Sequence, residues 1–371
     1  MTQKVKLKEI CCLINGRAYK QDELLETGKY PVLRVGNFFS DKDFYYSDLE
    51  LEPDKYCDDG DLLFAWSASF GPKIWNGGKA IYHYHIWKML LSDRVDKNYL
   101  FYYLYYLSER IKSEGHGGIM IHTTKAEMEE REFFLPELPI QKQIANLLRN
   151  SASILAIRKQ QLQKLDELVK ARFIELFNNV NSPMKTVAEL CSYIVDCPHT
   201  TPKYEGILKN PAIRTSEIKK GYIVWDTMKY VSDEEYLQRT ARLIPKVGDI
   251  VYGREGTFGN AAILPEGYNF CLGQRVMLLR PDYSKCTSEY LLYAVISDDV
   301  YRQAAEKNNA STVAHVNVKD VRQFRVPLPS FDKQNEFAAF VMQVDKSKAA
   351  IQKALDEAQL LFDSLMQKYF G

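Results

Sequence analysis

Three pairs of loop segments carry side chains that could contact nucleic acid, and each pair has one member in either half of the chain. Their residues share polar, basic or aromatic character: Arg17, Tyr19 and Lys20 with His199, Thr200, Thr201, Lys203 and Tyr204; Trp66, Ser67, Ser69 and Lys73 with Arg254 and Thr257; His116 and His122 with Asn308, Asn309, Ser311, Thr312 and His315. Side chains of these types on loops hydrogen-bond to base edges and phosphates. These loops are therefore candidates for contacts with nucleic acid, although each one alone could be an ordinary solvated turn.

Details of these loops refine the hypothesis. Prolines at 198 and 202 stiffen the loop that holds His199 and Lys203. Glu255 could accept a hydrogen bond from a cytosine amine, or it could neutralise the adjacent Arg254. Gly117 and Gly118 would let backbone amides approach a phosphate closely.

Motifs for catalysis are missing from the sequence. There is no G-x-x-x-x-G-K-[ST] loop for a nucleotide motor and no Asn-Pro-Pro-aromatic run of an amino-methyltransferase. The glycine-rich stretch 253–259 matches no dinucleotide spacing and is better explained as a turn. His83-Tyr84-His85 could hold a metal, but alternation along a strand favours packing. We predict no catalytic residue, no metal site and no cofactor.

Composition places the chain in a broad class. Its 371 residues are 46% hydrophobic and 12% aromatic, which indicates folded domains. The seven cysteines are scattered and odd in number, which indicates reduced thiols in a cytoplasmic protein. No apolar stretch is long enough to span a membrane, so we expect no membrane partner. Net charge is only +1, but residues 140–185 carry eight basic and three acidic side chains.

Two long segments repeat with a constant separation of 193 residues. Leu135–Gln141 (LPELPIQ) returns as Leu328–Gln334 (LPSFDKQ), and each phrase is followed by helix-compatible residues up to Phe177 and Phe370. Both segments keep a 4-3 heptad spacing, which predicts coiled-coil packing. The residues expected to pair the helices are Leu148, Leu155, Leu162, Leu165 and Val169 with Val341, Val344, Ile351, Leu355, Phe362 and Leu365. The alternative is that each helix packs only on its own domain.

The globular blocks that precede these helices also match each other. Val5–Cys11 resembles Lys185–Cys191, and Gly60–Phe64 resembles Gly248–Tyr252. Short apolar runs bounded by Gly, Pro and Asp predict strands, while 98–112 and 288–306 predict helices. The fold class is therefore α+β, with two such domains related by a pseudo-twofold axis and separated by two long antiparallel coiled-coil helices. The expected ranges are 1–139 and 181–330 for the domains, and 140–180 and 331–371 for the helices.

This order of module, helix, module, helix resembles the specificity subunit of Type I restriction–modification systems. The resemblance rests on the two proline-rich phrases and on Leu168–Phe173 and Phe362–Phe370, which look like the family's repeated regions. The loop Asp196–Tyr204 and the run Ala310–Val316 are similar to segments of its target recognition domains. Together these matches cover the whole chain.

The resemblance implies a function. Each target recognition domain reads one half of a bipartite, asymmetric duplex DNA site, and the helices act as spacers and dock two methyltransferase subunits, to which a restriction and translocation subunit can be added. The subunit itself carries no catalytic site. Two rival hypotheses remain at this stage: a coiled-coil adaptor whose modules bind protein, and an enzyme that acts on nucleic acid by itself.

Overall fold

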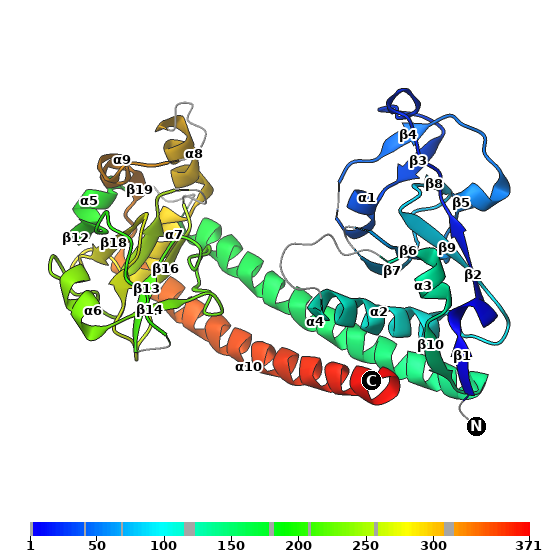
Figure 1. Cartoon of the computed structure of the whole chain (residues 1–371). Coiled ribbons are helices and arrows are strands. Elements are labelled where there is room, and N and C mark those ends of the chain that lie inside the picture. The colour runs from blue at the N-terminus through cyan, green and yellow to red at the C-terminus, as the bar shows by residue number, and fades with distance from the viewer. Residues whose placement is uncertain are drawn as a thin grey trace. The chain divides into compact units, whose positions relative to one another are not determined.

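The computed structural model describes residues 3–40, 42–67, 70–114, 123–177, 182–206, 209–255, 259–307 and 315–371. The chain forms two compact units. Unit 1 contains residues 1–159 and 353–371, and unit 2 contains residues 160–352. The two long helices, α4 (Leu138–Phe177) and α10 (Phe331–Phe370), are drawn in Figure 1, and each contributes residues to both units.

Unit 1 is an α+β fold with three small sheets. The strand orders are β1-β10, β2-β9-β6-β7 and β4-β3-β8-β5. The strands are β1 (Gln3–Lys6), β2 (Cys11–Asn15), β3 (Tyr30–Leu33), β4 (Tyr45–Ser47), β5 (Tyr56–Cys57), β6 (Leu62–Ala65), β7 (Gly71–Ile74), β8 (Ala80–Tyr82), β9 (Ile86–Leu91) and β10 (Glu132–Leu135). The helices are α1 (Val35–Phe39), α2 (Lys97–Glu114) and α3 (Lys125–Glu129), with short 3-10 turns η1 (Leu7–Glu9), η2 (Gln21–Glu23) and η3 (Pro53–Lys55).

Unit 2 is built on the same plan. Its strand orders are β11-β19, β12-β18-β15-β16 and β14-β13-β17. The strands are β11 (Met184–Thr186), β12 (Cys191–Asp196), β13 (Asn210–Ile213), β14 (Lys229–Val231), β15 (Ile250–Gly253), β16 (Ala261–Ile263), β17 (Cys271–Leu272), β18 (Val276–Pro281) and β19 (Arg325–Pro327). The shorter helices are α5 (Val187–Leu190), α6 (Asp233–Arg239), α7 (Ser288–Val295), α8 (Asp298–Lys307) and α9 (Val318–Gln323).

The register of the strands confirms the sequence repeat. In unit 1, β3 and β8 pair in parallel with Val32 opposite Ile81. In unit 2, β13 and β17 pair in parallel with Ala212 opposite Cys271. All the other pairings between named strands in the described residues are antiparallel, so this one parallel pair recurs at the same place in both units. The prediction of two repeated α+β domains is confirmed.

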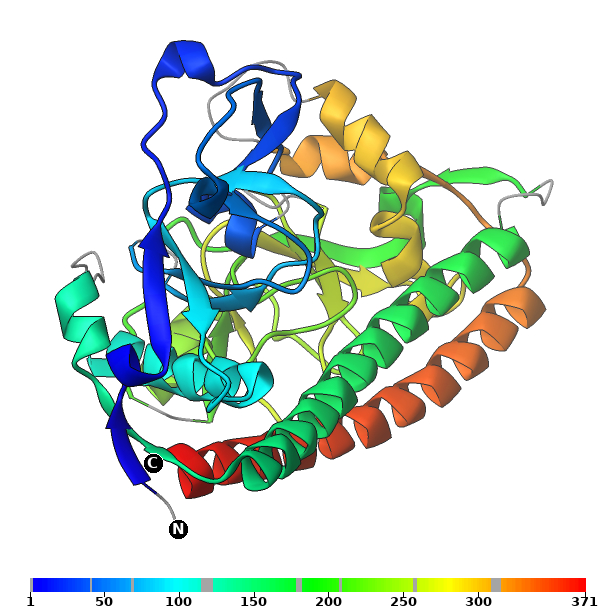
Figure 2. The same cartoon turned by 90° about the vertical axis from the view of Figure 1, so that its right-hand side faces the viewer.

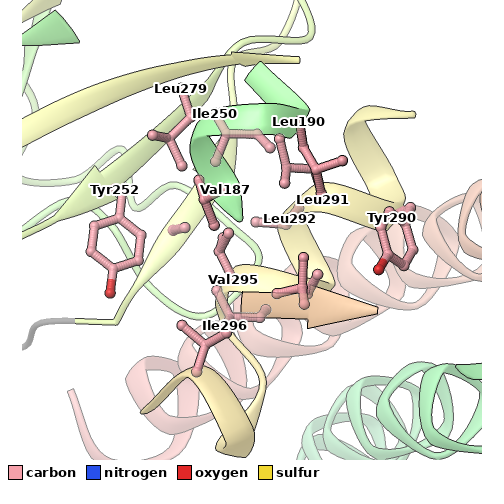
Figure 3. Close-up of a cluster of buried hydrophobic side chains, with 14 of the residues drawn as sticks. Val187, Leu190, Ile250, Tyr252, Leu279, Tyr290, Leu291, Leu292, Val295 and Ile296 are labelled. Atoms are coloured by element: carbon pink, nitrogen blue, oxygen red, sulfur yellow. The ribbon is translucent and has the colours of Figure 1, made fainter. Parts of the chain in front are cut away.

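In the four-stranded sheet of unit 2, strands β15 and β18 are buried on both faces. Successive side chains of a strand point in opposite directions, so each of these strands contributes to two clusters. Ile250 and Tyr252 of β15 belong to a hydrophobic cluster that includes α5, α7 and the two long helices (Figure 3). Val251, between them, belongs to a second cluster formed with β13 and β17. This sheet therefore connects the helical layer to the second sheet.

The long helices are α4 (Leu138–Phe177) and α10 (Phe331–Phe370), and they end at the residues that the repeat predicted. Every heptad position proposed for pairing is buried or half-buried, from Leu148 to Leu365. In unit 2 the helices lie side by side in opposite directions (Figures 1 and 2), because Asp166 pairs with Lys348 at 2.5 Å and Arg172 pairs with Glu336. Phe173 and Phe337 pack edge to face at 5.4 Å between ring centres.

In unit 1 the last turns of α10 pack against α2 (Figure 1). Phe362 lies 6.4 Å from Tyr102 and Phe370 lies 5.3 Å from Tyr99, measured between ring centres. The Tyr106 hydroxyl donates a hydrogen bond of 2.7 Å to Oε1 of Gln367. The aromatic residues of α2 therefore bind the C-terminal helix to a domain that is more than 200 residues away in sequence.

A buried glutamine repeats the same hydrogen bonds at the start of both long helices. The Gln141 Oε1 atom accepts from Asp96 N at 2.7 Å, and its Nε2 atom donates to Arg94 O and Pro136 O. Gln334 Oε1 accepts from Thr287 N at 2.9 Å, and Nε2 donates to Lys285 O and Pro329 O. Both side chains are fully buried, at 0% exposure. This glutamine joins each long helix to the residue preceding α2 or α7.

One expected helix is two helices in the structure. The range 288–306 was predicted as a single helix, but α7 ends at Val295 and α8 begins at Asp298. The Ser297 hydroxyl donates to Ala294 O at 2.7 Å and accepts from Val300 N at 3.3 Å. The Ser297 hydroxyl thus bonds a backbone carbonyl of α7 and a backbone N–H of α8. These hydrogen bonds replace those that a continuous helix would form at this point.

No helix in the described ranges combines the length and the apolar character that a membrane span requires.

Replacing Gln334 by alanine should destabilise unit 2, because it removes the partner of the Thr287 N–H and of the Lys285 and Pro329 carbonyls. We expect the free energy of unfolding to fall by about 3 kcal/mol. Urea denaturation and amide hydrogen exchange in α7 measure this loss. The control Gln343→Ala, at an exposed position of α10, should leave both unchanged. Equal exchange rates in the two variants would contradict the role given to Gln334.

Candidate nucleic-acid interface

In each unit, three backbone segments are joined by hydrogen bonds, and the segments of one unit are equivalent to those of the other. They form the scaffold of the candidate interface. In unit 1, Trp66 N donates to His85 O at 3.0 Å, and Thr123 N donates to Trp66 O at 3.3 Å. In unit 2, Arg254 N donates to Arg275 O and Val316 N donates to Arg254 O, both at 2.9 Å. Trp66 and Arg254 therefore occupy equivalent positions, as the sequence pairing predicted.

The first loop pair is also equivalent in the two units. Gly16 N donates to Ile86 O at 3.2 Å, and Cys197 N donates to Val276 O at the same distance. Gly16 has no room for a side chain, because a Cβ atom there would lie 2.2 Å from Tyr82 O. The residues that follow, from Arg17 in unit 1 and from Pro198 in unit 2, begin the two candidate loops.

In unit 1 the first loop is held by an ion pair. Arg17 donates to both carboxylate oxygens of Glu23 at 2.9 and 2.6 Å and lies over the Tyr19 ring. These hydrogen bonds lower the pKa of Glu23 to about 2. Burial raises the pKa of Tyr19, whose hydroxyl approaches Tyr82 O at 3.4 Å. Lys20 is exposed, so it is the group of this loop that is best placed to meet a ligand.

A stack of aromatic rings extends from the core of unit 1 to its surface. Trp87 stacks on buried Phe64 and on half-buried Trp66, with both ring-centre distances 5.9 Å. The Trp66 ring also meets His85 edge to face at 5.0 Å, and its Nε1 donates to Tyr84 O. Burial lowers the pKa of His83 to about 4, so this histidine is neutral at pH 7. The surface here is aromatic.

The position of His83-Tyr84-His85 differs from the expectation. We predicted alternation along a strand, but these residues form the turn between β8 and β9, where Ile86 N donates to His83 O at 2.9 Å. The three rings lie 3.9 to 4.9 Å apart between centres. Within the described residues, no group of three or more His, Cys, Asp and Glu is placed to hold a metal ion.

Other predicted residues of unit 1 have structural contacts. Lys73 Nζ donates to Phe38 O at 2.7 Å and lies over the Phe38 ring. Ser67 is buried at 6% exposure. Ser69, His116 and His122 lie outside the described residues.

In unit 2 the loop after β12 is tied to the scaffold by a buried ion pair. Arg254, 5% exposed, pairs with Asp196 at 2.8 Å. The exposed His199 lies 3.5 Å from the other carboxylate oxygen of Asp196. The sequence had offered Glu255 as a partner of Arg254, but Glu255 instead pairs with Arg275 at 2.9 Å and with His315 at 3.3 Å.

A second arginine, Arg239 of α6, fixes the loop at Thr200. It is 6% exposed, and its Nη2 donates to Thr200 O at 3.1 Å and its Nε to Leu272 O at 2.9 Å. Thr200 and Thr201 remain exposed, as does Lys203. Tyr204 lies beneath two cations, Arg214 and Lys229, at 5.7 and 4.8 Å from its ring centre.

The structure brings together the first and second loops of unit 2 and His315 from the third. Thr257, Asn308, Asn309, Ser311 and Thr312 lie outside the described residues. Sequence reasoning missed Gln274 and Arg275, which join this group from the turn between β17 and β18: Gln274 Nε2 donates to Thr201 Oγ1 at 2.9 Å. Their position follows from the repeat, because this turn is the equivalent of His83-Tyr84-His85.

Comparison with known proteins identifies the class to which this fold belongs. Residues 2–167 and 206–359 match the sequence profile of the Type I restriction modification DNA specificity domain. The match covers most of the chain, so the chain belongs to this family and is a specificity subunit of a type I restriction–modification system.

Individual relatives agree with this assignment. The chain is 23% identical over 327 residues to the Type I restriction enzyme MjaVIII specificity subunit of Methanocaldococcus jannaschii, covering 80% of this chain and 76% of the relative. It is 20% identical over 401 residues to the Type I restriction enzyme EcoBI specificity subunit of Escherichia coli, covering 98% and 83%. The fold is similar to that of the type I S subunit from M. genitalium, with a TM-score of 0.57 at 16% identity over 100% of this chain and 96% of that one.

Replacing Asp196 by alanine should destabilise unit 2, because it leaves the buried Arg254 charge without a partner. We expect a loss of about 3 kcal/mol in the free energy of unfolding, measured by urea denaturation. The double variant Asp196→Ala/Arg254→Leu should recover most of this loss. The control Asp299→Ala, which breaks an exposed pair with Arg302, should change little. If the double variant were as unstable as the single one, the ion pair would not be the cause.

Proposed function

We propose that each α+β unit reads one half of a split duplex DNA target, and that the two halves differ in sequence. The observation that carries this proposal is the pair of equivalent scaffolds with different side chains. One backbone arrangement carries Trp66, Tyr84 and His85 in unit 1, and in unit 2 it carries the buried Arg254 together with Gln274 and Arg275 of the turn. Loops on a shared framework are where selectivity resides.

The chemistry of the two surfaces supports unlike half-sites. The aromatic rings of unit 1 suit apolar contacts, such as those with a thymine methyl group. The guanidinium, amide and carboxylate groups of unit 2 suit hydrogen bonds with base edges in the major groove. A target read by two such surfaces is asymmetric.

The low net charge supports dependence on partner subunits. Affinity for duplex DNA comes largely from basic side chains that neutralise phosphates. This chain has a net charge of only +1, so its excess of basic side chains is small. We infer that methyltransferase subunits provide the remaining contacts and hold the duplex on this chain. A restriction subunit can add to the same assembly.

An exposed apolar stripe on α4 supports docking of such a partner. Ile140, Leu147 and Ile154, at seven-residue intervals in unit 1, are 45%, 41% and 49% exposed. A heptad stripe on the surface of a helix is the pattern by which one helix packs against another. We propose that a helix of a methyltransferase subunit covers this stripe.

The helices also have the length needed for a spacer. Each has 40 residues, or about 60 Å at 1.5 Å per residue. We propose that the length of the helices sets the number of base pairs between the two halves of the target. The spacers would then be the helical segments expected from the sequence, residues 140–180 and 331–371. Methyl transfer then belongs to the partner, and this chain contributes no catalytic group.

Selection of bound sequences from a pool of random duplexes, with the chain assembled with its methyltransferase, tests the reading function. We expect two short motifs separated by a fixed spacer. His199→Ala combined with Lys203→Ala should relax or weaken one motif only, because both residues lie on one exposed loop of unit 2. The control Arg242→Ala removes an exposed charge elsewhere in unit 2 and should preserve both motifs. An adaptor that binds only protein would select no sequence.

Ile154→Glu should reduce binding of the methyltransferase by at least tenfold, because it places a charge in the apolar stripe. Size-exclusion chromatography and calorimetry measure the assembly. Ser153→Glu adds the same charge at an exposed neighbouring position outside the stripe and should assemble normally. Normal assembly of the Ile154 variant would show that the partner docks elsewhere.

A further inference from the structure

The turn between β17 and β18 of unit 2 presents an arginine in a fixed position. Arg275 is 61% exposed at its side chain, and its backbone has a φ of 64°. Few non-glycine residues adopt this left-handed conformation, and it persists where the surrounding structure enforces it. The exposed guanidinium therefore projects from a backbone that has little freedom.

Hydrogen bonds fix this turn on both sides. Gly273 N donates to Ile213 O at 2.7 Å, and a Cβ atom on Gly273 would lie 2.7 Å from the same oxygen, so only glycine fits. The buried Arg239 donates to Leu272 O at 2.9 Å and to Gly273 O at 3.4 Å. After the turn, Arg275 O accepts from Arg254 N.

The side chain of Arg275 is oriented as well as its backbone. Its Nε lies 2.9 Å from Oε2 of Glu255, while Oε1 of Glu255 lies 3.3 Å from Nδ1 of His315. An arginine held through Nε keeps its terminal amino groups available for a second, bidentate partner. The neighbouring Gln274 directs its amide toward Thr201.

Resting on the proposed function, we propose that Arg275 reads a guanine in the half-site of unit 2, and that Glu255 is its positioning residue. A guanidinium fork matches the O6 and N7 acceptors of guanine in the major groove. The equivalent turn of unit 1, His83-Tyr84-His85, carries neither a guanidinium nor a carboxylate, so this recognition belongs to one half-site only.

Arg275→Gly provides a direct test, because glycine adopts a positive φ without strain and the turn is preserved. The chain, assembled with its methyltransferase, is used to select sequences from random duplexes. In the wild type we expect one invariant G·C pair in the motif assigned to unit 2. In Arg275→Gly, discrimination at that pair should fall by about 10- to 100-fold, the usual value of one bidentate contact.

Two further variants separate base reading from other roles. Arg275→Lys keeps the charge but lacks the planar fork, so it should lose most of the discrimination. Glu255→Gln should reduce discrimination at the same base pair and at no other. The control Arg242→Ala removes one exposed positive charge from unit 2 and should leave the motif unchanged.

The outcomes distinguish the two levels of the proposal. If the wild-type assembly selects no sequence, the proposed reading function fails. If it selects a bipartite motif that Arg275→Gly leaves intact, only the role of Arg275 fails. A uniform loss of affinity with unchanged sequence preference would show that Arg275 contacts a phosphate, and would also overturn the assignment to guanine.

Discussion

The structure depends on one repeated interaction, the buried glutamine at the start of each long helix. A primary amide has two N–H donors and one acceptor oxygen. Gln141 and Gln334 each use both donors and the oxygen to bond three backbone groups from two separate segments. Because both side chains are fully buried, water cannot replace any of these bonds. The long helix therefore cannot shift along its axis without breaking them, and its heptad positions stay aligned with the globular core.

This alignment explains how the helices become part of the domains. In unit 2, Phe173 and Phe337 belong to the same hydrophobic cluster as the sheet residues Ile250 and Leu279. In unit 1, Phe362 and Phe370 pack on the aromatic face of α2. The helices are thus components of the cores and not merely connections between domains, while a different face of α4 leaves Ile140, Leu147 and Ile154 exposed.

A rigid core permits variation at the candidate interface. The equivalent positions 66 and 254 make the same backbone hydrogen bonds, yet one holds an indole that stacks on Trp87 and the other a guanidinium that pairs with Asp196. The side chain at each position has its own supporting residues: stacked aromatic rings in unit 1 and carboxylates in unit 2. The repeat thereby keeps the geometry of the candidate interface and changes its chemistry.

The sequence by itself determined the two helices, their ends at Phe177 and Phe370 and the repetition of two α+β domains. These features arise from local periodicity and from an internal repeat, both of which are visible without knowing any distant contact. Most strands could be located from short apolar runs bounded by turn residues. The break at Ser297 was missed, and 288–306 was predicted as one helix. Hydrophobic periodicity depends on apolar residues, so it is almost unaffected by a single hydroxyl that bonds the ends of two helices.

Only the tertiary structure decided which charged groups meet. Arg254 could have paired with the adjacent Glu255, but the fold places Asp196 beside it and directs Glu255 to Arg275 and His315. Gln274 and Arg275 went unnoticed in the sequence because a Gly-Gln-Arg turn has no special composition. Partner choice among charges depends on distances of a few ångströms between segments that are tens of residues apart, and these distances are set by sheet pairing and core packing.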